Sequence, residues 1–256
     1  MSARACAELV ERGDPERFAA TMAAPVAVRD ALWPLYAANL EIARAPWASA
    51  EPMVAEMRLQ WWIDAIRDLA AGSEPPGHPV AEALAPLMAR DPGLAGLLTG
   101  LAEARRWDCW REPFEDRAAF DSYIDATSGN LMWAAARSLG ATETAEPAIR
   151  DFAWGAGLAA YLRAAPELEA RGRIPFTDGQ PESLARLAEE GRARIARART
   201  AGIPRAARPA LWTGATAAAI LARAARDPGL VAKAALGPSF FARRTALLVR
   251  ALTGRI

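Results

Sequence analysis

The chain has 256 residues, of which 52% are hydrophobic and 24% charged, and its formal net charge is +1. This composition excludes an intrinsically disordered chain and is sufficient for one large buried core. Because much of the apolar share is alanine, we expect helices that approach one another closely. The two cysteines, Cys6 and Cys109, lack the spacing of a zinc site or a disulfide framework.

The predicted elements are helical nearly throughout. Alanine, leucine, arginine and glutamate are strong helix formers and dominate the sequence, while strand-like alternation of β-branched residues does not occur. Asp-Pro pairs such as Asp14-Pro15 indicate helix starts, and Glu167–Gln180 is the least regular stretch. In chain order we predict helices over 4–12, 15–23, 25–45, 50–71, 78–89, 94–110, 116–138, 145–165, 180–200, 205–225 and 239–252. No linker divides them, so we expect a single all-α domain over residues 1–256.

Charge is distributed unevenly along these elements. Residues 1–128 contain 20 acidic and 12 basic residues, residues 129–256 contain 10 acidic and 19 basic ones, and Asp227 is the only acid after Arg192. Such asymmetry is typical of a surface that meets phosphates, anionic lipid or an acidic partner, although solvated helix faces produce it too. Residues 1–13 lack an apolar stretch, so we expect no secretory segment there, and no run of about 18 apolar residues occurs. We therefore expect a cytoplasmic protein, and peripheral contact with the inner face of a membrane stays open as an alternative.

Several common catalytic patterns are missing. The one histidine, His78, lies in a proline-rich loop, which argues against histidine-based catalysis. Asp64 and Asp68 are four residues apart but alternate with Arg67, as on a solvated helix face. The tryptophans, among them Trp33, Trp61, Trp62 and Trp133, follow apolar helical faces and are predicted to be core, so nucleic-acid binding is not expected.

Five short motifs occur in an order that resembles squalene/phytoene synthases. They are Arg29 followed by Leu35-Tyr36-Ala37, then Met57-Arg58-Leu59-Gln60-Trp61-Trp62, Tyr123 with Thr127-Ser128-Gly129, Leu162-Arg163, and Gly172-Arg173-Ile174-Pro175. The resemblance extends from about Asp14 to about Pro228. It implies an isoprenoid-synthase-like helical bundle around a central apolar cavity, in which two prenyl diphosphates are joined head to head.

The chain departs from this family at the metal site. The resemblance implies two pairs of aspartates that hold Mg²⁺ against the leaving diphosphate, because Mg²⁺ prefers carboxylate oxygens. The positions of those aspartates hold Ala43, Trp47, Ala164 and Leu168, and Leu40 replaces a family arginine. Because these side chains cannot bind Mg²⁺, we expect no metal cofactor. The leaving diphosphate then loses its main stabiliser, and the sequence indicates no catalytic residue.

The segment around Asn39 and Glu41 resembles a branch of this family that includes a mitochondrial assembly factor of respiratory complex I and also lacks the aspartates. One hypothesis is therefore a catalytically inactive protein that binds or assembles a respiratory complex, with its basic C-terminal third against a membrane or a subunit. The alternative is an active prenyl diphosphate transferase with atypical metal ligands. A third hypothesis is that the cavity binds an isoprenoid or quinone-like lipid without reacting it. The candidate substrate-binding residues are Tyr36, Arg58, Tyr123, Arg163 and Arg173, unless their arginines form structural ion pairs with Glu41, Asp64 or Asp125.

Overall fold

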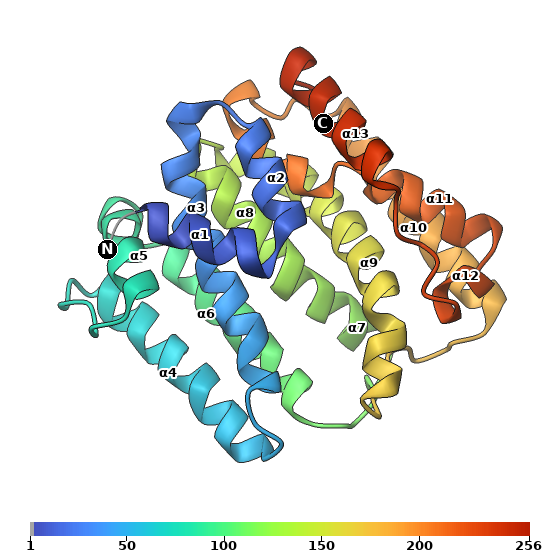
Figure 1. The fold of residues 1–256 in the computed structure, drawn as a ribbon, viewed down its shortest axis with the longest axis horizontal. Coiled ribbons are helices and arrows are strands. Elements are labelled where there is room, and N and C mark those ends of the chain that lie inside the picture. The colour runs from blue at the N-terminus through green and yellow to red at the C-terminus, as the bar shows by residue number, and fades with distance from the viewer. Residues whose placement is uncertain (1–2) are drawn as a thin grey trace.

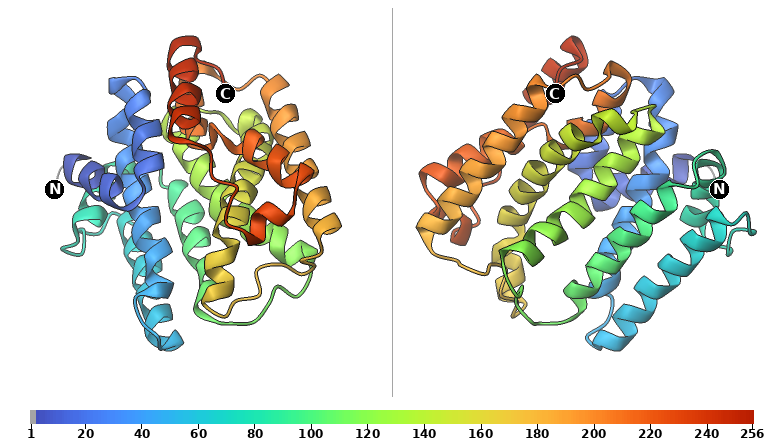
Figure 2. Two further views of the ribbon diagram at one scale, coloured as in Figure 1. Left: turned by 45° about the vertical axis from the view of Figure 1, so that its right-hand side comes forward. Right: turned by 180° about the vertical axis from the view of Figure 1, so that it is seen from behind.

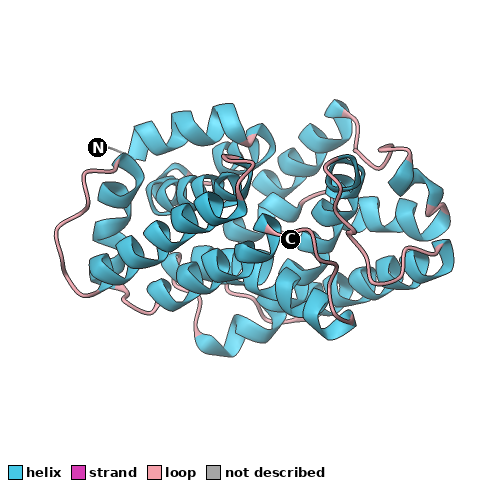
Figure 3. Cartoon of the chain, turned by 90° about the horizontal axis from the view of Figure 1, so that it is seen from below, coloured by secondary structure: helices cyan, strands magenta, loops and turns pink. Residues whose placement is uncertain are grey.

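The computed structural model describes residues 3–256, and these form helices joined by turns, with no strand among them (Figures 1 and 3). The α-helices are α1 (Ala3–Gly13), α2 (Pro15–Ala23), α3 (Val26–Arg44), α4 (Pro52–Ala70), α5 (Pro79–Arg90), α6 (Leu94–Ala104), α7 (Arg117–Ile124), α8 (Asn130–Ser138), α9 (Glu146–Ala170), α10 (Pro181–Thr200), α11 (Ala217–Arg226), α12 (Gly229–Ala232) and α13 (Phe240–Thr253). Short 3₁₀ or π segments are η1 (Ala45–Trp47), η2 (Arg105–Cys109), η3 (Asp125–Gly129), η4 (Glu143–Ala145) and η5 (Arg205–Gly214).

Side-chain caps explain where several helices begin. The Asp14 carboxylate accepts a hydrogen bond of 2.9 Å from the backbone amide of Arg17, and Pro15 occupies the first turn of α2, as predicted. Ser239 caps α13 in the same way through the amide of Ala242. His78 caps α5, because its ring nitrogen accepts from the amide of Val80 at 3.3 Å. The histidine therefore has a structural role at the end of its loop.

Three predicted helices are interrupted, and one continues further than expected. The helix predicted over 116–138 contains the π turn η3, where the Thr127 hydroxyl donates to the carbonyl of Tyr123 at 2.6 Å. The predictions over 94–110 and 205–225 are wrong where 3₁₀ turns replace the α-helix. Pro209 explains the second interruption because it has no amide hydrogen to donate. Helix α9 continues through Pro166 to Ala170 instead of ending at 165.

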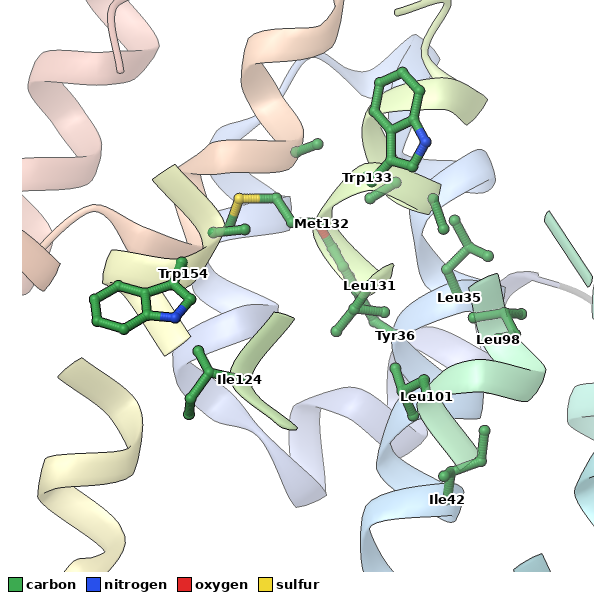
Figure 4. Packing of buried hydrophobic residues seen from close by; sticks show 14 of the residues in the cluster. Leu35, Tyr36, Ile42, Leu98, Leu101, Ile124, Leu131, Met132, Trp133 and Trp154 are labelled. Atoms are coloured by element: carbon green, nitrogen blue, oxygen red, sulfur yellow. The ribbon is translucent and has the colours of Figure 1, made fainter. Parts of the chain in front are cut away.

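The core lies between α3, α6, α8 and α9 (Figure 4). Leu35 on α3, Leu98 on α6 and Trp133 on α8 are all buried there. Helices α4 and α5 pack beside α3 and α6 (Figures 1 and 2). Helix α9 contacts α8 and η3 as well as α10 and α11, so it is covered on both sides. No helix within residues 3–256 is long and apolar enough to cross a membrane.

Candidate functional site

Only two of the five candidate residues meet in space. Tyr123 on α7 and Arg173, just after α9, both bond to Asp108 in η2. Tyr36, Arg58 and Arg163 lie elsewhere in the bundle: Tyr36 contacts Arg17, Arg163 pairs with Glu16, and Arg58 is exposed. The prediction that all five line one site is therefore not supported by their contacts.

A buried network of hydrogen bonds surrounds the Asp108 carboxylate, and Asp108 is only 2% exposed. The Tyr123 hydroxyl donates to this carboxylate, with both oxygens at 3.0 Å, and accepts a bond of 2.8 Å from the Arg105 guanidinium. Arg105 also donates to Asp108 at 2.8 Å. Burial raises the pKa of Tyr123 well above its ordinary value, so the phenol is neutral and suited to donate. The three side chains thus form one hydrogen-bonded network around a buried carboxylate.

Arg173 closes this network from the other side. It is 8% exposed and donates to the backbone carbonyls of Trp107 at 3.3 Å and of Asp108. Burial lowers the pKa of Arg173, because the charged guanidinium is separated from water without a carboxylate bonded to it. The side chain therefore connects the end of α9 to η2.

Aromatic rings fill the space around this network. Trp107 stacks on Phe114 with ring centroids 4.0 Å apart and planes 8° apart, and Tyr123, Phe120 and Tyr161 meet Phe114 within 6.4 Å. The Tyr161 hydroxyl donates to the carbonyl of Pro175 at 2.8 Å, which fixes the loop after α9. The interior beside Tyr123 is therefore occupied by packed rings.

Arg163 on α9 forms an ion pair with Glu16 on α2. Two bonds of 2.9 and 2.8 Å join the guanidinium to the two carboxylate oxygens, and Arg243 of α13 bonds to the same carboxylate. Arg163 thus forms a structural ion pair, as in the alternative, but its partner is Glu16 rather than Glu41, Asp64 or Asp125; Asp125 pairs with Arg150, and Asp64 accepts from Gln60. Arg163 therefore ties together helices that are distant in the sequence.

This cluster predicts a pH effect. The hydrogen bond from Arg163 is the main cause that lowers the pKa of Glu16 in the folded protein. A depressed carboxyl pKa contributes stability above the unfolded value, about 4.3, that is lost as pH falls through the folded value. We expect Glu16→Gln to destabilise the protein by about 1 kcal/mol at pH 7 and by less at pH 4, as measured by urea unfolding. Glu8→Gln, which removes an exposed pair with Arg4, is the control. An equal difference at both pH values would contradict the prediction.

Tyr36 on α3 is buried, and its hydroxyl has no hydrogen-bond partner within residues 3–256. The Arg17 guanidinium lies 5.2 Å from the centre of its ring. Burial raises the pKa of Tyr36 strongly, so the group is a neutral phenol. Its environment is the hydrophobic core between α3 and α8 (Figure 4).

Arg58 lies on the outer side of α4, beside an open hollow of about 250 Å³ that Trp61, Trp62 and His78 also line. Trp62 is buried, whereas Trp61 is 39% exposed and contacts His78, with ring centroids 5.2 Å apart. The prediction of a core position is confirmed for Trp33, Trp62 and Trp133 but wrong for Trp47, Trp61 and Trp110, which are exposed. The sequence did not indicate which side of α4 faces solvent, because tryptophans on both sides obscure the periodicity of its apolar residues.

A second hollow, of about 380 Å³, lies between α7 and α10, and none of the five candidate residues lines it.

The four expected metal positions offer no carboxylate. Ala43 is half-buried on α3, Ala164 is exposed on α9, and Leu168 packs against the core. The Trp47 ring lies against two guanidiniums, those of Arg171 at 4.5 Å and Arg173 at 5.5 Å from its centre. The segments after α3 and α9 therefore meet through cation–π contacts.

Comparison with known proteins assigns the chain to a family. A model described as squalene/phytoene synthase matches residues 10–178, more than half of the chain. The chain belongs to the squalene/phytoene synthase family. This family member also resembles a crystal structure of a dehydrosqualene synthase in complex with ligand, with a TM-score of 0.69 and 18% identity over 96% of this chain and 93% of the other. The predicted isoprenoid-synthase-like helical fold is confirmed.

The curated relatives of this family member carry another name. NADH dehydrogenase (ubiquinone) complex I, assembly factor 6, is 24% identical over 172 residues in Bos taurus, covering 67% of this chain and 51% of the relative. The Homo sapiens protein is 24% identical over 170 residues, covering 66% and 51%. The chain thus spans about half the length of these relatives, and its predicted resemblance to the assembly-factor branch is confirmed.

The Mg²⁺ ions that the family implies do not fit the residues present. The side chains at the four positions have no oxygen ligand, and two guanidiniums lie against one of them. Within residues 3–256 no group of three or more His, Cys, Asp or Glu side chains could hold a metal ion. The side chains at these positions therefore do not support a metal-dependent step.

The sequence interpretation missed Asp108 and Arg105. They lie in Arg105-Arg106-Trp107-Asp108, a charged segment directly after the apolar helix α6. The available signal was an aspartate surrounded by Trp107 and Cys109, because a carboxylate among apolar residues requires a partner.

Proposed function

We propose that this family member does not catalyse prenyl transfer and acts instead as a binding or assembly protein for a respiratory complex. The supporting observation is the set of residues at the metal positions, namely Ala43, Trp47, Ala164 and Leu168. Departure of diphosphate requires stabilisation of several negative charges, a contribution of several kcal/mol from bound metal. We propose that the chain binds no such metal.

The contacts around Trp47 support the same conclusion. The guanidiniums of Arg171 and Arg173 lie against this ring, so positive charge is already present beside a position where the family would collect divalent cations. Like charges at short range oppose metal binding. Packed rings beside Tyr123 likewise argue against the hypothesis of an isoprenoid or quinone-like lipid in that space. The assembly role is supported by the names of the curated relatives.

A pyrophosphate assay tests the loss of catalysis. The protein is incubated with farnesyl or geranylgeranyl diphosphate and Mg²⁺ or Mn²⁺, with a dehydrosqualene synthase as the positive control. We expect no pyrophosphate above the protein-free blank. Release that depends on the metal would refute the proposal and support the alternative, an active transferase with atypical ligands.

A genetic experiment tests the assembly role. The gene is deleted in its source organism, and the amount of assembled NADH dehydrogenase complex in the membranes is measured by native electrophoresis and NADH oxidation. We expect less assembled complex, restored by the wild-type chain. Normal amounts of complex without the gene would contradict this role and leave the result of the pyrophosphate assay unaffected.

A further inference from the structure

Helix α13 exposes an apolar face to solvent. Phe240 is 65% exposed, Phe241 78%, Leu248 58% and Leu252 78%. Phe241, Leu248 and Leu252 are seven and four residues apart and therefore share one side of the helix. Exposed aromatic and aliphatic side chains that form a continuous stripe are typical of an interaction surface.

The opposite side of α13 is held by the bundle. Arg250 is 8% exposed and donates to the carbonyl of Ala215 at 2.8 Å, and Leu247 packs on the small cluster around Trp212. Arg243 is bonded to Glu16 on α2. These contacts fix the rotation of the helix, so its apolar side chains remain exposed to solvent. The helix itself lies at the edge of the bundle (Figure 2).

The exposed charged side chains on α13 and directly after it are basic. Residues 228–256 contain five basic residues and no acidic one. Arg244 lies on the exposed side of α13, 4.6 Å from the ring centre of Phe240, and Arg255 is exposed as well, whereas Arg243 and Arg250 bond to the bundle. The carboxylate that faces α13 from α2, Glu16, is already paired with two arginines. The exposed surface of α13 is therefore apolar and basic together.

We propose that α13 docks the protein onto a membrane that contains anionic phospholipid. An amphipathic helix with apolar and basic exposed side chains inserts its apolar residues among the headgroups, while its cations attract acidic lipid. Pairing of α13 with α13 of a second copy would bring the Arg244 and Arg255 side chains of both copies together, which favours lipid over this form of dimer. The inference concerns a different surface from the family site and does not depend on the proposed function.

Sedimentation with vesicles tests the proposal. We expect the protein to pellet with vesicles of phosphatidylcholine mixed with phosphatidylglycerol but not with phosphatidylcholine alone. Binding should decrease with salt, because the Debye length falls from about 8 Å at 0.15 M to about 3 Å at 1 M. The double variant Phe241→Ser/Leu252→Ser should bind about tenfold or more weakly, and Arg244→Gln about fivefold more weakly.

The matched control is Met57→Ser on α4, since Met57 is 67% exposed but belongs to another helix. This variant should bind vesicles as the wild type does. The proposal is overturned if the protein ignores anionic vesicles, binds both vesicle types equally, or loses binding equally in the Met57 variant. It is also overturned if light scattering shows a dimer that the double variant dissociates while vesicles remain unbound.

Discussion

Asp108→Asn is expected to destabilise the protein by about 3 kcal/mol. The substitution preserves the shape of the side chain but removes the charge that pairs with Arg105, and it places amide hydrogens where the Tyr123 hydroxyl now donates. Loss of one partner of a buried ion pair typically costs about 3–5 kcal/mol, because the remaining charge stays in a poorly hydrated site. The Arg105 side chain is 24% exposed, so a value near the lower limit follows. Urea unfolding followed by circular dichroism measures this free energy.

Two further variants make the Asp108 experiment specific. Asp121→Asn removes a partly exposed pair with Arg117 and should cost less than about 1 kcal/mol. The double variant Asp108→Asn/Arg105→Met should be more stable than Asp108→Asn alone, because it removes the guanidinium that would remain unpaired. If Asp108→Asn behaves like Asp121→Asn, the network around Tyr123 does not stabilise the fold.

Gly155→Ala is expected to destabilise the protein by about 1–3 kcal/mol although alanine favours helices. An added Cβ would lie 2.6 Å from Cγ1 of Ile195 and 2.7 Å from the carbonyl oxygen of Gly191, both on α10. A backbone atom at that distance cannot move without displacing the helix, and overpacking of this kind costs about 1–3 kcal/mol. The change in melting temperature and urea unfolding measure the effect.

Gly96→Ala on α6 is the matched control for this steric prediction. A Cβ at Gly96 would meet no heavy atom within 4 Å, so the variant should gain about 0.5–1 kcal/mol from helix propensity. The two substitutions are chemically identical but should have opposite signs. A stabilising Gly155→Ala would mean that α9 and α10 do not approach each other closely at this position.

The helical class and the family could be predicted because they depend on local patterns and on motif order. Asp14-Pro15 begins α2 through its own cap, and Met57 to Trp62 belong to one helix, so these features require no knowledge of distant contacts. The closely approaching helices expected from alanine content are present where Gly155 faces Gly191. Helix interruptions were missed at η3, where a side-chain bond of Thr127 competes with the backbone pattern.

The candidate site could be predicted only in part. Tyr123 and Arg173 meet at Asp108, but Arg58 lies on the outer side of α4, and Arg163 pairs with Glu16, which is 147 residues away along the chain. Spacing along a helix gives relative positions on that helix, whereas it does not indicate which side faces a neighbour. The outward position of Arg58 and the partner of Arg163 therefore could not be obtained from periodicity.

Local sequence alone determined that this chain forms helices, belongs among the squalene/phytoene synthases and has no aspartates at the expected metal positions. Each of these properties depends on residue identity and short-range spacing. Tertiary structure decided that Trp47 contacts Arg171 and Arg173, that Asp108 is buried beside Tyr123, and that the apolar face of α13 remains outside. Burial and pairing result from the packing of whole helices against one another, and the free energies involved depend on neighbours distant in the sequence.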